Sequence, residues 1–199
     1  MRTTYNTSYC SGTKEEVTTD TLSEAFFAAQ EEKIDYVLVP STTGYSAEMA
    51  LNKVPDTLAL IVVTHSHGYL KNGESEFPET LRSFITESRH KLLTATHAFK
   101  GLEGYLQKKY GGISLAQSFA DGIRMISPGL KVLIEISVMV CDSGLLGVNN
   151  WIVSCGGTHR GLDTSAIIKP TTSHFINQFK FGRLISFPNN KQNGGGKNA

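Results

Sequence analysis

The sequence predicts an α/β protein of three layers, in which helices cover both faces of a mostly parallel sheet. In the first hundred residues, helical patterns alternate three times with short apolar runs. Each run is continuously apolar rather than alternating, which is typical of strands that are buried on both faces. The chain has 199 residues, of which 40% are hydrophobic, so it can build the core of one domain.

The first half contains the alternating elements. Residues 1–20 are polar and are expected to be irregular. Thr21 and Glu24 have the spacing of a capping box, which predicts that a helix begins there, and Pro78 suits the first turn of another helix. The patterns predict helices at residues 21–33, 46–54 and 78–90, and strands at 34–41, 57–65 and 91–97.

The second half is less regular. Residues 114–126 predict a helix, and residues 131–146 have the β-branched content of a strand but the length and spacing of a buried helix, which we favour. Two short strands at 151–157 and 164–170, joined by THRGLD, predict a hairpin that closes the sheet. We expect one domain over residues 1–187 and a disordered, glycine-rich tail over 188–199.

Charge and cysteine content restrict the partners and the compartment. Lys and Arg number 19 against 18 Asp and Glu, so no bulk charge favours nucleic acid or an anionic membrane. The three cysteines form no C-x-x-C pair, so neither a disulfide framework nor a structural zinc site is expected. The first residues lack the apolar segment of a signal peptide. These features predict a cytoplasmic protein that binds neither nucleic acid nor membrane.

The loops that follow the strands are the expected place for a ligand, because parallel strands bind ligands at their carboxyl ends. The first such loop, STTGYS, leads from a strand into a helix, where free amides and the helix dipole favour an anion. Two interpretations stay open: a phosphate-binding loop, or a hydroxyl-rich helix cap. The residues concerned are Ser41, Thr42, Thr43, Gly44, Tyr45 and Ser46.

The loop of the predicted hairpin could complete such an anion site. It combines glycines and a hydroxyl with a guanidinium, which can grip a phosphate with two hydrogen bonds. Taken alone, a long turn with an exposed arginine is the simpler interpretation. The residues concerned are Gly156, Gly157, Thr158, Arg160 and Gly161.

Histidines also follow the strands and are the candidates for acid–base chemistry: His65, His67 and His97. With His159 they could gather around zinc, but no H-E-x-x-H motif is present, and we expect no metal. Glu135 and Asp142 lie in an otherwise apolar segment, and a buried carboxylate needs a partner, which Arg124 or Arg160 could supply. The alternative role for Glu135 is a general base with a raised pKa.

Several motifs resemble a known fold family. DYVLVPSTTGYSAEMAL and NNWIVSCGGTHRGLDTSAIIKP resemble the effector-binding segments of the pyruvate kinase C-terminal domain. VVTHSHGY, LLTATHAF, KKYGGI, EISVMVCDSGLL and GGTHRGLDT are similar to stand-alone, uncharacterised prokaryotic proteins with that fold. The resemblance covers residues 21–170. It implies the three-layer fold, phosphate recognition by the two loops, self-association into a homo-oligomer, and flavin mononucleotide (FMN) as a ligand.

The resemblance does not imply pyruvate kinase activity, because that active site belongs to a barrel that this chain lacks. Tyr45 and the extra histidines also depart from the kinase pattern. We expect a protein that binds a phosphorylated small molecule, with a flavin ring resting on Phe99 or Tyr69. The alternatives are an enzyme that acts on a phosphorylated metabolite through histidine, and a regulatory or oligomerisation module.

Overall fold

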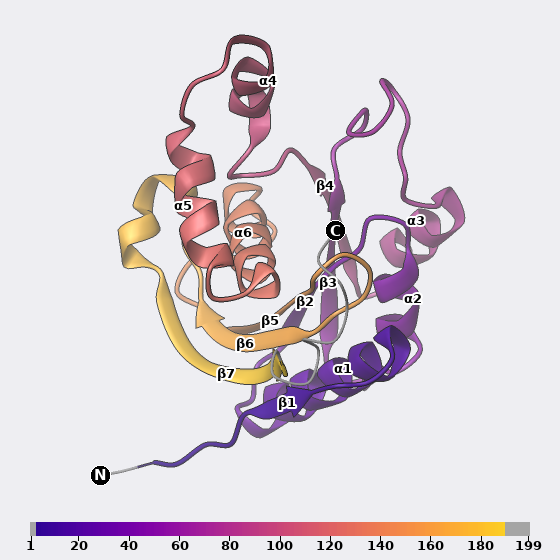
Figure 1. Cartoon of the computed structure of the whole chain (residues 1–199). Helices are drawn as coiled ribbons and strands as arrows, with labels where there is room; N and C mark the ends of the chain where they lie inside the picture. The colour runs from indigo at the N-terminus through magenta and orange to yellow at the C-terminus, as the bar shows by residue number, and fades with distance from the viewer. Residues whose placement is uncertain (1–2, 190–199) are drawn as a thin grey trace.

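The computed structural model describes residues 3–189. One seven-stranded sheet runs through it in the order β1-β7-β6-β5-β2-β3-β4 (Figure 1). The strands are β1 (Ser8–Cys10), β2 (Tyr36–Pro40), β3 (Ala59–His65), β4 (Lys91–Ala95), β5 (Ile152–Gly156), β6 (Thr164–Lys169) and β7 (Lys180–Pro188). The helices are α1 (Lys14–Glu31), α2 (Tyr45–Leu51), α3 (Glu79–Thr86), α4 (Gly101–Tyr110), α5 (Leu115–Arg124) and α6 (Pro128–Asp142), with a 3₁₀ helix, η1 (Ser173–Gln178).

The sheet is mixed but mostly parallel. Strands β5, β2, β3 and β4 are parallel neighbours, and β1 is parallel to β7. Only β6 runs antiparallel, between β5 and β7. The predicted α/β class and mostly parallel sheet are therefore confirmed.

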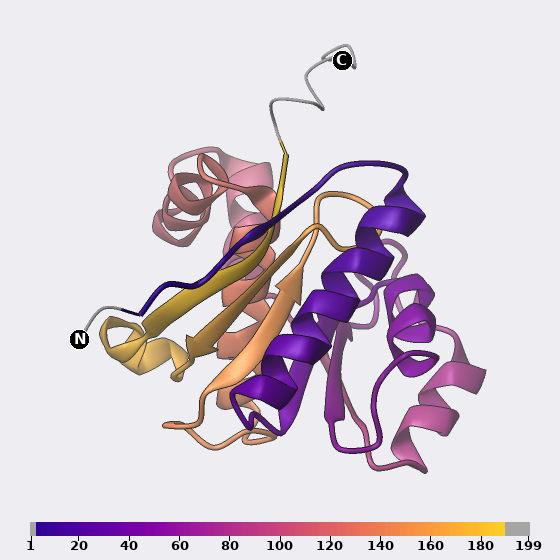
Figure 2. The same ribbon diagram turned by 90° about the horizontal axis from the view of Figure 1, so that it is seen from below.

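Helices cover both faces of the sheet, and the alternation of side chains along β2 shows why the strands are apolar throughout. Val37 and Val39 pack into one buried cluster with residues of α1, α2 and α3. Leu38, between them, packs into a second cluster with Leu133 and Ile136 of α6. Figure 2 shows α1 lying across one face of the sheet and α6 behind the other. Because both faces are buried, no polar alternation appears in the sequence.

The ambiguous segment at 131–146 is helical, as favoured. Helix α6 begins after Ser127, whose hydroxyl accepts a hydrogen bond from the amide of Leu130 (3.3 Å). Pro128 occupies the first turn, where its missing amide hydrogen costs nothing. The β-branched residues of the segment are explained by burial rather than by a strand, since most of α6 is enclosed between the sheet and α5.

The first helix begins earlier than predicted. Thr13 and Glu16 form the capping box, with the Thr13 amide donating to the Glu16 carboxylate (2.8 Å), so the predicted cap at Thr21 is wrong. Thr21 is instead buried inside α1, with its hydroxyl 3.5 Å from the carbonyl of Leu162. The same T-x-x-E spacing occurs twice, and packing of the helix against the β5–β6 loop selects the first.

The sheet also extends beyond the predicted hairpin. Strands β5 and β6 do pair antiparallel, but β7 and β1 continue the sheet, so the hairpin does not close it. Pro188 still belongs to β7, and residues 190–199 of the predicted tail lie outside the described residues. Strand β1, helix α4 and strand β7 were not predicted.

Between residues 3 and 189, no helix combines the length and apolar character needed to cross a membrane.

Candidate functional site

The topology brings the predicted loops to one edge of the sheet. After β2 the chain adds β3 and β4 on one side and returns to place β5 on the other. The carboxyl end of β2 is therefore the point where the strand order reverses, which is where open α/β sheets bind ligands. The loops after β2, β3, β4 and β5 all leave from this edge, because those four strands are parallel.

A cavity of about 640 Å³ lies at this edge, a size that suits a small molecule. The loops after β2, β4 and β5 line it, together with the end of β3 and one face of α6. Its lining residues are Pro40, Ser41, Thr42, Thr43, Tyr45, Ser46, Val63, Thr64, His65, His97, Lys131, Val132, Glu135, Ile136, Met139, Gly157, His159, Arg160 and Gly161.

The first loop acts both as a helix cap and as a wall of the cavity. The Ser41 hydroxyl accepts a hydrogen bond from the Ala47 amide in the first turn of α2 (3.2 Å). Gly44 precedes α2 with a φ of 92°, a left-handed conformation that glycine adopts without strain. Thr42 lies 3.3 Å from His65, hydroxyl to Nε2. The cap interpretation therefore holds for Ser41, and the phosphate-binding interpretation stays a prediction for the other hydroxyls of the loop that line the cavity.

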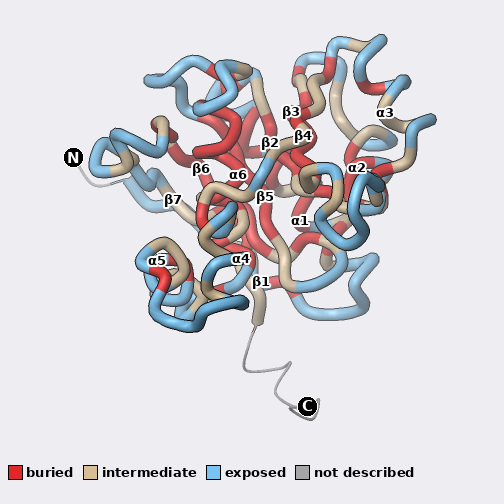
Figure 3. Tube along the Cα trace, turned by 90° about the horizontal axis from the view of Figure 1, so that it is seen from above, coloured by how far each residue is buried: buried red, intermediate tan, exposed pale blue. Residues whose placement is uncertain are grey.

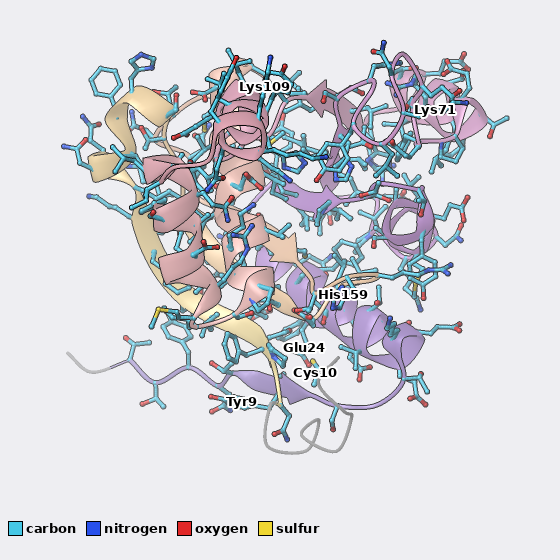
Figure 4. All side chains as sticks on the ribbon, turned by 45° about the horizontal axis from the view of Figure 1, so that its top comes forward. Tyr9, Cys10, Glu24, Lys71, Lys109 and His159 are labelled. Carbon is cyan, nitrogen blue, oxygen red and sulfur yellow. The ribbon has the colours of Figure 1, made fainter. Side chains whose placement is uncertain are left out.

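Tyr45 connects the first loop to the last. The guanidinium of Arg160 lies over the Tyr45 ring, 4.3 Å from its centroid, in the geometry of a cation–π contact. In Figure 1 the loop between β5 and β6 reaches toward α2, and Figure 4 marks His159 on that loop. Residues more than a hundred positions apart in the sequence therefore form one wall of the cavity.

Glycines allow the last loop and α6 to approach closely. A Cβ atom on Gly156 would lie 2.0 Å from the carbonyl oxygen of Gly129 in the first turn of α6. A Cβ atom on Gly157 would lie 2.0 Å from the carbonyl oxygen of Gly161. The Asp163 carboxylate accepts from the Thr158 amide (2.8 Å) and completes the turn. Because these glycines lack side chains, the loop can fold tightly and lie directly against the amino-terminal half of α6 at the cavity.

Glu135 is the centre of a buried polar cluster. Its carboxylate accepts hydrogen bonds from the Phe99 amide (3.1 Å) and from Lys131, and His97 Nδ1 lies 3.2 Å away. Burial by itself would raise the pKa of Glu135, but the hydrogen bonds and charges of His97 and Lys131 overcome it and hold the pKa at about 2. Burial lowers the pKa of Lys131, and Glu135 partly offsets this.

The predicted partner of Glu135 was wrong. Arg124 pairs with Asp121 in α5, and Arg160 stacks on Tyr45. The observed partner, Lys131, lies one helical turn before Glu135, at the i, i+4 spacing of helical ion pairs. This spacing is visible in the sequence once the segment is taken as helical. The pKa of Glu135 is lowered rather than raised, because the hydrogen bond with His97 and the charge of Lys131 outweigh burial.

Three rings pack against one another at tilted angles beside this cluster. The His65 ring lies 4.8 Å from that of His97, and Tyr69 lies 4.1 Å from His65 and 5.2 Å from His97, centroid to centroid. His65 Nδ1 and His97 Nε2 are buried and have no hydrogen-bond partner among residues 3–189. Burial lowers the pKa of His65, and the charge of neighbouring His97 adds to the effect.

Six predicted site residues do not line the cavity, and one of them, Tyr69, packs against His65 and His97 beside it. His67 is exposed, so it does not converge with His65. Phe99 is buried, with its ring edge-on to Phe119 at 5.3 Å, so it does not offer a face for a flavin. The other three, Gly44, Gly156 and Thr158, shape the loops from behind. Among the side chains of the cavity that can carry a positive charge, Lys131 and His159 were not expected to bind the ligand.

Neither a metal cluster nor a reactive thiol is apparent in the described part of the chain. No group of three His, Cys, Asp or Glu residues between 3 and 189 is arranged to hold a metal ion. All three cysteines are buried and free. Burial raises the pKa of Cys155 to about 12, and burial together with the charge of Asp142 raises that of Cys141 to about 11. Thiolates at these positions are therefore scarce near neutral pH.

The buried histidines predict a pH dependence of stability. Burial lowers the pKa of His65 and of His90, whose Nδ1 accepts from the Leu60 amide (3.0 Å). As the pH falls from about 7 to about 5, the unfolded chain binds protons at these positions before the folded chain does, so the free energy of unfolding should fall. Urea denaturation across this range should show a smaller fall in His65→Gln and His90→Gln. The exposed His174→Gln variant should match the unmodified protein, and an equal change in all three variants would contradict the assignment.

No family model matches the sequence. The evidence for function therefore comes from the residues of the cavity.

Proposed function

We propose that this protein binds a phosphorylated small molecule in the cavity at the carboxyl ends of the strands. One observation carries the proposal: the two loops that the sequence singles out for anion binding line the same cavity and touch each other through Tyr45 and Arg160. A hairpin turn with an isolated exposed arginine would not need this contact.

The phosphate would lie between the first loop and Arg160. Thr42, Thr43 and Ser46 line the cavity and can donate hydroxyl hydrogen bonds. The α2 amides nearby add the favourable end of the helix dipole. Arg160 supplies the positive charge, and its guanidinium is already oriented by the Tyr45 ring.

The remainder of the ligand would extend toward His65, His97 and α6. FMN, which the resemblance to the pyruvate kinase C-terminal domain suggests, is the first candidate. Because Phe99 is buried, a flavin ring would instead rest on Tyr45 or on the rings around His65. The three-layer arrangement of that domain, without its barrel, remains our proposal for the fold family, and the helices on both faces of the sheet support it.

Matched pairs of compounds test the proposal. Melting temperatures would be measured with FMN against riboflavin, and with ribose 5-phosphate against ribose. A ligand that binds only the folded chain raises the melting temperature, so the phosphorylated member of at least one pair should do so and its partner should not. Equal effects within every pair would contradict phosphate recognition. A colourless preparation that FMN does not stabilise would exclude FMN as the ligand but would leave the sugar phosphates as candidates.

Arg160→Gln should weaken binding of the phosphorylated compound by about 10-fold or more, because a hydrogen bond to a charged group contributes roughly 1.5–3 kcal/mol. The side chain is exposed, so the melting temperature without ligand should change little. Isothermal calorimetry gives the affinity. Lys53→Gln removes the same charge at an exposed position beyond the other end of α2 and should leave the affinity unchanged. Equal affinities for both variants would exclude Arg160 from the site.

We also propose that the chain self-associates through the surface of α4 and α5. Large apolar side chains gather there in exposed positions, an arrangement that marks interaction surfaces. Figure 3 shows how much of this surface is exposed. A mass from light scattering equal to one chain would contradict self-association. The exposed residues are Leu102, Tyr105, Leu106, Tyr110, Ile113, Leu115 and Phe119.

A further inference from the structure

We propose that the cavity is a proton-transfer site in which His97 is the general base, Glu135 positions it, and Lys131 stabilises the negative charge that forms on the substrate. The substrate class is a phosphorylated α-hydroxy aldehyde or ketone. This inference rests on the proposed function, because the same cavity must hold the phosphate.

The position of Glu135 determines the state of His97. The carboxylate is held from two sides, by the Phe99 amide (3.1 Å) and by Lys131, so it cannot turn away from the imidazole. An ionised carboxylate can only accept hydrogen bonds. His97 Nδ1, 3.2 Å from it, must therefore carry the hydrogen, which leaves the lone pair of the neutral ring on Nε2.

No group in the described structure donates a hydrogen bond to that lone pair. His97 Nε2 is buried and has no hydrogen-bond partner among residues 3–189. Most buried polar side-chain atoms have a partner, so a buried nitrogen without one needs an explanation. Since His97 also lines the cavity, a ligand that offers a proton to Nε2 provides it. A histidine oriented through its other nitrogen by a carboxylate is the arrangement that acid–base catalysis uses.

Lys131 supplies the second group that the reaction requires. Its ammonium has three hydrogens, and Glu135 takes one of them. The side chain is buried and lines the cavity next to Glu135. A fixed cation in a buried site stabilises a developing oxyanion better than water does. A base beside such a cation is suited to remove a proton from the carbon next to a carbonyl group, whose oxygen then carries the charge.

The step balances without a co-reactant. His97 Nε2 takes the proton from the hydroxyl-bearing carbon next to the carbonyl, and the C–H electron pair forms a carbon–carbon double bond. The carbonyl π pair moves to oxygen, where Lys131 stabilises it. Return of a proton to the same carbon regenerates the substrate. Return to the former carbonyl carbon, with the hydroxyl proton passing to the oxyanion, gives the isomeric sugar phosphate.

Tyr69 controls access to the base. Its ring packs on both imidazoles, and it lies in the segment between β3 and α3 that Lys71 marks in Figure 4. Because Nε2 is covered in this arrangement, Tyr69 must move before a substrate carbon can reach it. Loop movements of this kind accompany substrate binding in many enzymes.

Deuterium exchange tests the proposal. Dihydroxyacetone phosphate, ribose 5-phosphate and fructose 6-phosphate would each be incubated with the protein in D₂O, and proton NMR would follow loss of the signal next to the carbonyl. We expect exchange in at least one compound that also raises the melting temperature. His97→Gln, which can still donate to Glu135, should slow exchange by about 100-fold or more while the compound still stabilises the variant. His174→Gln, exposed in η1, should exchange at the unmodified rate.

The other outcomes separate the two proposals. Binding without exchange would overturn the catalytic inference and leave the binding function intact, and so would stabilisation by FMN alone. No stabilisation by these compounds or by FMN would overturn both. Exchange that is lost in His65→Gln but not in His97→Gln would overturn the choice of base. In Glu135→Gln the exchange rate at saturating compound should fall while the compound still raises the melting temperature, because His97 loses the carboxylate that holds the hydrogen on Nδ1. An unchanged rate at saturation would show that Glu135 does not position the base.

Discussion

Gly156→Ala is expected to lower the free energy of unfolding by about 3 kcal/mol or more, at the upper end of the range for overpacking. A Cβ atom at this position would lie 2.0 Å from the Gly129 carbonyl oxygen and 3.0 Å from the Leu133 amide nitrogen. Both contacts are with backbone, so no side chain can rotate away. Relief would require α6 to move off β5, and α6 carries Lys131 and Glu135 into the cavity.

Chemical denaturation of the variant measures this effect. Gly122→Ala is the matched control, because no atom beyond its chain neighbours and the nearby backbone of its own helix lies within 4 Å of the added Cβ, and the residue is exposed in α5. The control should gain roughly 0.5–1 kcal/mol, since alanine is favoured over glycine inside a helix. If Gly156→Ala proved as stable as the control, the close approach of β5 and α6 would be wrong.

Glu135→Gln is expected to cost about 3–5 kcal/mol, the range seen when one partner of a buried ion pair is removed. The variant leaves the Lys131 ammonium buried without its counter-charge, and His97 loses a charged acceptor. The carboxylate is 2% exposed, so water cannot replace it without rearrangement of the site. This cost is separate from any effect on catalysis.

A second substitution distinguishes a lost partner from lost packing. Glu135→Gln with Lys131→Met removes both charges and should recover most of the lost stability, because charge burial is then no longer required. Glu31→Gln, exposed at the end of α1, should change stability by less than about 0.5 kcal/mol. A double variant no more stable than Glu135→Gln would show that the Lys131 charge is not the cause.

Acid denaturation gives an independent measure of the same pair. The pKa of Glu135 is about 2 in the folded chain, below its ordinary value of 4.5. The folded state therefore gains stability from this group above the ordinary value and loses it as the pH falls from there to about 2. The unmodified protein should lose more stability over this range than Glu135→Gln does, and parallel curves would contradict the ion pair.

Part of the site could be predicted because its residues follow the ends of buried strands. The loops after β2 and β5 were recognised by their glycines and hydroxyls, and both line the cavity. Their meeting could not be derived from composition, since it depends on β5 pairing beside β2. The role of Tyr45 was open for the same reason, because its partner is Arg160 on the other loop.

Other elements could not be predicted because their local patterns admit two answers. T-x-x-E occurs at Thr13 and again at Thr21, and only the packing of α1 decides between them. Strand β1 has three residues and depends on its partner β7. Strand β7 pairs with β6 through irregular register, which obscures the alternation expected of a strand with one exposed face.

The sequence by itself determined the α/β class, the parallel strands and the loops that carry the chemistry, because apolar runs and turn residues act over a few neighbouring positions. The tertiary structure alone decided which loops meet, which glycines lie against a neighbouring backbone, and which groups outside α6 surround Glu135. The hydrogen bond from the Phe99 amide to the Glu135 carboxylate joins residues 36 positions apart in sequence. Such contacts depend on how the strands pair and how α6 lies on the sheet, and no local pattern records either.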